Sequence, residues 1–305
     1  MATKDTKTTK KTTQKKENKV VESKLNWLPN KTFELEVTIP WELVAKTYDE
    51  VLERTAKNLT LKGFRKGKAP KQMVESYVGK QKLYEQTAQE IVTESYFHAV
   101  KQHNLRPIMH PNITPVSVEE NKDWKVKAVS CEAPEVKLGN YKEAIKGLKA
   151  KSAIWTPEKG KVEEKDQKAA GPTVDQILGE LLNSAEIGIS EMLLNAETNR
   201  MLSNLVDQVN AVGMTVQQYL EANGKEQKQL QQEYRALAEK SLKLEFAIAK
   251  VSEENQITVT EKEISEMIEN TKDPNVRKQL EQPEQKNYLS LLIRKQKTID
   301  FLKSL

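Results

Sequence analysis

The 305-residue sequence has little of several residue types on which specialised proteins depend. Its single cysteine, Cys131, excludes a disulfide framework or a thiolate metal site within one chain. No apolar run approaches the ~20 residues that span a membrane. The lysines near the N-terminus are not followed by the apolar segment of a secretory signal. These absences favour a reducing, cytoplasmic location and disfavour secreted and membrane classes.

Signatures of catalysis are also missing. The only histidines are His98, His103 and His110. Glu94 and His98 share a predicted helix face, but no His-Glu-x-x-His pattern accompanies them. Cys131 falls on a predicted strand and is interpreted as a small buried apolar residue. With no pairing of a nucleophile and a base in view, the sequence predicts neither an enzyme, nor a metal site, nor a cofactor.

Charge is abundant and unevenly distributed. The net charge is +5, yet residues 1–140 hold 25 Lys and Arg against 18 Asp and Glu, whereas residues 141–305 hold 24 against 26. The excess is densest at 57–82, where Glu75 is the only acidic residue among eight basic ones. Basic charge concentrated in this way indicates an anionic partner for the N-terminal half.

Within this segment, residues 63–70 read Gly-Phe-Arg-Lys-Gly-Lys-Ala-Pro. The two glycines permit an unusual backbone path, and Pro70 favours the first turn of a helix. We therefore predict an exposed basic tip that contacts phosphate or an acidic protein surface. The plain alternative is a solvated connection. A phosphate-binding P-loop is excluded because only three residues separate Gly63 from Gly67 and Ala69 follows Lys68.

Periodicity predicts an α+β module in the N-terminal half. Residues 1–24 are Lys- and Thr-rich with almost no apolar anchors, and we expect them to be a disordered tail. Residues 33–39 alternate as a half-buried strand. Helices are expected at about 41–59, 70–79 and 80–104, and further strands are expected around 116–118 and 123–136.

Composition changes at 150–172, where Lys, Glu, Gly and Pro indicate a linker. All that follows is predicted to be helical and elongated. Thr173 with Gln176, and Thr260 with Glu263, form capping boxes that mark helix starts. The other expected helices are those at about 190–212, 216–220 and 226–254, and one that follows a break at Pro274 and Pro283 and runs to the C-terminus.

The order of these features resembles the bacterial trigger factor family of ribosome-associated chaperones. Residues 63–70 match that family's ribosome-docking signature residue for residue. Residues 134–139 are similar to the closing strand of its ribosome-binding domain. The segments at 189–194 and 257–264 are similar to landmarks of its chaperone domain. The resemblance covers about 26–150 and 174–305.

The resemblance implies a chaperone that binds nascent or unfolded polypeptide without ATP. It implies an α+β ribosome-binding domain at 25–149, a linker at 150–172, and an all-α chaperone domain with arm-like helices at 173–305. The implied partners are ribosomal RNA and ribosomal protein at the exit tunnel, and unfolded clients. The implied docking residues are Gly63, Phe64, Arg65, Lys66, Gly67 and Lys68. Most members carry an FKBP-like prolyl isomerase domain where only the linker stands here, so no isomerase activity is expected.

Several alternatives stay open. Four methionines are candidate client contacts, although filling a gap between helices is the favoured role for any one of them. These are Met192, Met201, Met214 and Met267. An RNA-binding or ribosome-assembly protein without clients is the alternative function. A cell-envelope chaperone similar to SurA is disfavoured by the missing signal and by the docking signature. A weak homodimer also stays open.

Overall fold

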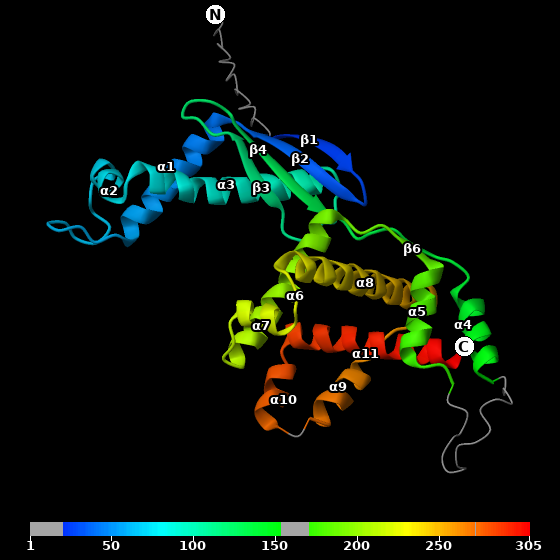
Figure 1. Ribbon diagram of the computed structural model, residues 1–305. Coiled ribbons are helices and arrows are strands. Elements are labelled where there is room, and N and C mark those ends of the chain that lie inside the picture. Colours follow the sequence, from blue (N-terminus) through cyan, green and yellow to red (C-terminus); the bar gives the residue numbers. More distant parts are fainter. Residues whose placement is uncertain (1–20, 154–170, 272) are drawn as a thin grey trace, which may run out of the picture. The chain divides into compact units, whose positions relative to one another are not determined.

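A computed structural model describes residues 21–153, 171–271 and 273–305 (Figure 1). It divides into two compact units. Unit 1 comprises residues 21–27 and Phe33–Ser130, and unit 2 comprises Leu28–Thr32 and Cys131–Leu305. The expected linker at 150–172 and the expected tail at 1–24 lie mostly outside the described residues.

Unit 1 is a four-stranded sheet covered by helices. The strands are β1 (Glu22–Leu28), β2 (Thr32–Ile39), β3 (Asn112–Ser117) and β4 (Trp124–Cys131), in the order β1-β2-β4-β3. The helices are α1 (Trp41–Asn58), α2 (Lys71–Val78) and α3 (Lys80–Gln102), and α1 and α3 run side by side (Figure 1). The expected α+β class is confirmed.

The core of unit 1 follows from alternation along two strands. Phe33, Leu35, Val37 and Ile39 of β2 are fully buried, while the residues between them face outward. Trp124, Val126 and Ala128 of β4 lie on the same inner face and pack with α3. A second cluster, formed by Val51, Leu52, Val74 and Leu83, joins α1, α2 and α3 beyond the sheet.

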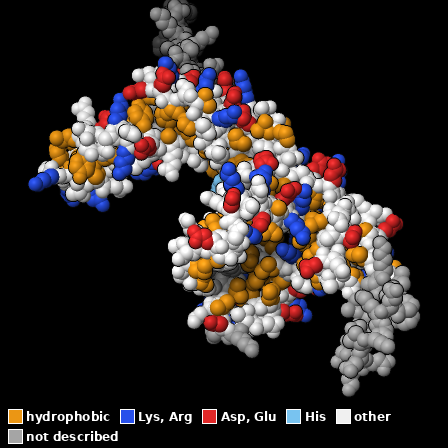
Figure 2. Space-filling view, viewed as in Figure 1, with side chains coloured by type: hydrophobic (Ala, Val, Ile, Leu, Met, Phe, Trp, Pro, Cys, Tyr) orange, Lys and Arg blue, Asp and Glu red, His pale blue; other side chains and the backbone are white. Residues whose placement is uncertain are grey.

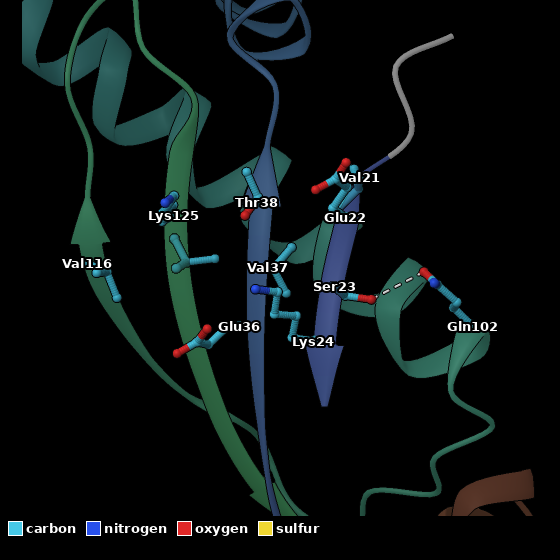
Figure 3. A pocket seen from close by; sticks show the side chains of 11 residues that line it. Val21, Glu22, Ser23, Lys24, Glu36, Val37, Thr38, Gln102, Val116 and Lys125 are labelled. Carbon is cyan, nitrogen blue, oxygen red and sulfur yellow. Dashed lines mark hydrogen bonds between the residues drawn. The ribbon is translucent and has the colours of Figure 1, made fainter. Parts of the chain in front are cut away.

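Strand β1 begins earlier than the sequence indicates, because its residues are fixed by contacts distant in the chain. Order is expected from Leu25, yet β1 starts at Glu22. The Ser23 hydroxyl donates a hydrogen bond to Gln102 Oε1 at 3.2 Å (Figure 3). It also lies 3.0 Å from His103 Nε2. Polar residues such as Glu22 and Ser23 carry no local signal for a strand, so the segment resembles the end of a tail.

Unit 2 is mostly helical. Its helices are α4 (Tyr141–Ala153), α5 (Val174–Ser184), α6 (Glu191–Ala211), α7 (Val216–Ala222), α8 (Gln227–Glu254), α9 (Glu261–Glu269), α10 (Pro274–Leu280) and α11 (Pro283–Ser304). Both expected capping boxes are present, at Thr173 and at Thr260. The core packs α4, α5, α8 and α11 together through residues such as Ile145, Leu181 and Leu302.

Two features of unit 2 depart from the expectation of helices alone. The strands β5 (Val136–Leu138) and β6 (Ala185–Ile187) pair antiparallel, so the strand expected within 134–139 exists but pairs across nearly 50 residues of sequence. Pro274 and Pro283 are expected to interrupt helices, yet each begins one, because proline is well accommodated in a first helical turn.

Candidate functional site

The segment 59–70 joins α1 to α2 as two consecutive tight turns. Leu61 O accepts a hydrogen bond from Phe64 N at 3.0 Å, and Arg65 O accepts one from Lys68 N at 2.9 Å. The third residue of each turn is a glycine with positive φ, +91° at Gly63 and +77° at Gly67. Local chemistry therefore shapes the loop, with Phe64, Arg65 and Lys66 carried between the two glycines.

Gly67, unlike Gly63, is also constrained by the close approach of neighbouring backbone. Its N–H points to Leu59 O at 3.4 Å, and a Cβ at this position would lie 3.3 Å from Lys57 O. No atom lies within 4 Å of a Cβ at Gly63. Below the tip, Leu59, Leu61 and Ala69 pack against the cluster that joins α1, α2 and α3. The loop is thus fastened at its base and free at its end.

The end of the loop is exposed and basic. Phe64 is 37% exposed, and Arg65, Lys66 and Lys68 are exposed as well. Within the described residues, none of these three cations forms an ion pair with a carboxylate. We call residues 62–68 the basic tip. Figure 2 shows its Lys and Arg side chains at the extremity of unit 1.

Among the described residues, two lysines near the basic tip are paired with carboxylates, unlike the cations of the tip itself. Lys71 pairs with Glu53 at 2.7 Å, and Lys80 pairs with Glu120 at 2.7 Å. Glu75, the one acidic residue of 57–82, accepts a hydrogen bond from Tyr48 Oη at 2.7 Å. Burial of Tyr48, together with this bond to Glu75, raises the pKa of the tyrosine. The bond holds the Glu75 carboxylate toward α1.

The four candidate methionines are not gathered at one place. Met201 lines a groove of about 440 Å³ between α6 and α8. Met214 packs in a small cluster of α6, α7 and α8, and Met192 is half-buried in α6. Met267 is exposed on α9. The methionines therefore do not form a common surface.

Several exposed apolar residues of unit 2 are not among the client contacts predicted from the sequence. Leu237, in the groove beside Met201, is 53% exposed, and Leu291 of α11 is 63% exposed with Tyr288 nearby in sequence. Periodicity marks all three as core-facing, because a pattern of apolar residues does not reveal which part of a long helix has a partner. Along α11, Leu289, Thr298 and Leu302 are buried, whereas Tyr288 and Leu291 point to solvent.

The described residues include a surface hollow of mixed charge and hold no candidate metal site. Nowhere in residues 21–153, 171–271 or 273–305 do three or more His, Cys, Asp and Glu side chains come together in a way that could hold a metal ion. Cys131 is buried. The hollow in Figure 3, over β1, β2 and β4, is lined by side chains of both signs, including Lys24, Glu36 and Lys125. Among the described helices, none has the length and apolarity to cross a bilayer.

Comparison with known proteins decides the family. A model described as bacterial trigger factor protein matches residues 18–168, and one described as bacterial trigger factor protein C-terminus matches residues 158–304. The chain belongs to the bacterial trigger factor family.

Curated trigger factors align with about a third of the chain. That of Lactobacillus gasseri is 41% identical over 109 residues, which cover 36% of this chain and 24% of the relative. That of Lactiplantibacillus plantarum is 39% identical over 110 residues, covering 36% and 25%. The chain thus spans about a quarter of the length of the curated relatives it matches.

A solved structure of the trigger factor chaperone, reported for promiscuous substrate recognition in folding and assembly, has the same fold. It superposes with a TM-score of 0.63 at 15% sequence identity, and the match covers 92% of this chain and 98% of that chain. The trigger factor fold, with its sheet unit and helical remainder, is thereby established for this family member.

Proposed function

We propose that this trigger factor family member is a ribosome-associated chaperone that binds nascent or unfolded polypeptide without ATP. The observation that carries the proposal is the basic tip. Its exposed Phe64 and unpaired cations stand on a fixed base, and the nearby acidic residue, Glu75, is turned to Tyr48. Such a tip suits ribosomal RNA or an acidic face of a ribosomal protein near the exit tunnel.

The client surface belongs to unit 2 in this proposal. Unfolded chains present short apolar segments, which bind exposed apolar side chains through weak contacts at several points. The groove between α6 and α8 offers Met201 and Leu237, and α11 offers Tyr288 and Leu291. The flexible side chains of Met201 and Met267 adapt to different clients. Met192 and Met214 are half-buried, so only the exposed part of each residue contributes to the proposed surface.

We further propose that the protein lacks prolyl isomerase activity. Helix α4 ends at Ala153 and α5 begins at Val174, so about 20 residues lie where most family members carry an isomerase domain. A segment of that length cannot bury a core of its own. The test is an isomerase assay on a proline tetrapeptide, in which measurable catalysis would contradict the proposal. A cytoplasmic location follows from the ribosome as partner, and sedimentation velocity tests the weak homodimer.

The docking proposal is tested by co-sedimentation with ribosomes. Replacing Phe64, Arg65 and Lys66 together by alanine should abolish binding, while the thermal unfolding curve stays unchanged because all three side chains are exposed. Lys24→Ala with Lys125→Ala, on the sheet face, is the matched control and should sediment as wild type. If the triple variant still sediments as wild type, the basic tip is not the docking site.

The client proposal has a separate readout. The full chain should suppress aggregation of a chemically denatured protein after dilution, and Leu237→Ser should weaken this suppression without changing ribosome binding. The triple-alanine variant should retain it. A protein that only binds RNA would show no suppression in any form.

A further inference from the structure

Helix α2, which follows the basic tip directly, exposes one apolar face. Met73 and Tyr77 are four residues apart and lie on the same side of the helix, with 51% and 67% of each residue exposed. Val74 and Val78, on the adjoining side of the helix, pack into the cluster with α1 and α3. Tyr77 is the most exposed aromatic residue of the described chain. We call Met73 and Tyr77 the α2 face.

Nothing in the fold of unit 1 accounts for Tyr77. Its hydroxyl makes no hydrogen bond in the part of the chain that the structure describes. Its ring joins none of the aromatic contacts found there, which include those of Tyr48 and Tyr84. The ring of Tyr77 is therefore accessible, together with Met73, to a partner outside unit 1.

The positive charge of the segment that leads into α2 favours an anionic partner. Lys62, Arg65, Lys66 and Lys68 lie on the segment that leads into α2, and none of them has a carboxylate partner among the described residues. Glu75, which is on α2 itself, is held by Tyr48. Figure 2 shows the apolar surface at this end of unit 1 beside blue side chains of the tip. A partner that covers the α2 face and extends over the preceding segment therefore meets uncompensated positive charge.

The combination of an exposed ring with nearby cations is typical of surfaces that bind unpaired nucleotides. Bases stack on an aromatic face while basic side chains contact the phosphates. RNA loops present such bases splayed out from the helix, whereas paired regions hide them. A neutral apolar protein surface would satisfy Met73 and Tyr77 but would leave the cations unpaired.

We propose that the α2 face binds an unpaired base of ribosomal RNA, with Tyr77 as the stacking ring and Met73 packed at its edge, while the cations of the basic tip contact the adjoining phosphates. This inference rests on the proposed ribosome docking and extends the docking surface beyond the loop signature. It assigns a binding role to two residues outside residues 63–70.

The test compares substitutions at Tyr77 by the affinity of the full chain for purified ribosomes. Tyr77→Phe keeps the ring and should bind within about 2-fold of wild type. Tyr77→Leu keeps apolar bulk but has no ring face, and should bind about 5-fold or more weakly, as expected for loss of one stacked base. Phe97→Leu, at an exposed aromatic on the distant part of α3, is the matched control and should change nothing.

A second readout identifies the partner chemically. Short-wavelength ultraviolet irradiation of the complex, followed by nuclease digestion and mass spectrometry, should find a nucleotide joined to the peptide that contains Tyr77. Equal affinities of Tyr77→Leu and wild type, or a crosslink from this peptide to a ribosomal protein alone, would overturn the inference. In that case the triple-alanine variant still decides separately whether the basic tip docks.

Discussion

The basic tip of unit 1 and the β5–β6 pair of unit 2 both depend on glycine, but for different reasons. At the tip, Gly63 and Gly67 adopt positive φ within turns whose hydrogen bonds join residues only three apart. At the strand pair, Gly139 N donates to Ser184 O at 2.9 Å, and a Cβ on Gly139 would lie 2.4 Å from that oxygen. The tip is thus a local structure, and the strand pair is a tertiary one.

The largest stability effect is expected at the strand pair. Gly139→Ala forces β5 away from the backbone of Ser184 and should lower the free energy of unfolding by about 3 kcal/mol, the upper range for an overpacked site. Gly179→Ala in α5 is the control, because a Cβ there meets open space and alanine favours a helix interior. Denaturant titration measures both, and equal stability of the two variants would show that the close approach at Gly139 is not required.

Replacing each of the two tip glycines by alanine should lower the free energy of unfolding, and by different amounts. Gly63→Ala is expected to cost about 1 kcal/mol for the positive φ alone. Gly67→Ala should cost more, about 1–2 kcal/mol, because its Cβ also approaches Lys57 O. The measurements are thermal unfolding and ribosome affinity. The reverse order would mean that the tip is not held against α1 as described.

This contrast explains which parts of the molecule can be predicted from sequence. The alternation of β2, the capping boxes at Thr173 and Thr260 and the exposed loop at 63–70 are visible because neighbouring residues determine them. Strand β1 and the β5–β6 pair are not, since their partners lie far along the chain. For the same reason, periodicity names Leu237 and Leu291 as apolar residues without revealing that they are exposed.

Salt should distinguish the two proposed binding surfaces. Contacts between cations and phosphates release counterions, so ribosome affinity should fall steadily as salt concentration rises. Removing one tip cation, as in Arg65→Ala or Lys68→Ala, should reduce the slope of log affinity against log salt by about 0.7. Suppression of client aggregation, which depends on Leu237 and its apolar neighbours, should change little with salt concentration. A ribosome affinity that is independent of salt would contradict the electrostatic role of the tip.

The smallest expected effect on stability concerns Glu263. Its carboxylate makes one contact within its own helix cap and one with a residue distant in the sequence. Glu263 accepts hydrogen bonds from Lys297 Nζ on α11 at 2.7 Å and from Thr260 N in its capping box at 2.8 Å. The bond from Lys297, followed by that from Thr260, lowers the pKa of Glu263 from 4.5 to about 2. Because the pKa is lower in the folded state, this contribution to stability is complete above about pH 4.5 and is lost as pH falls toward 2.

Glu263→Gln separates the two contacts. Glutamine at the third helical position still completes a capping box, as Gln176 and Gln218 do in this chain, but it carries no charge for Lys297. Wild type should therefore be slightly more stable than Glu263→Gln near pH 7, and this difference should shrink between pH 4.5 and 2. Thermal unfolding of both proteins across this range measures it. A difference that stays constant with pH would assign the stabilisation to the cap alone, because only the charged contact with Lys297 requires an ionised carboxylate.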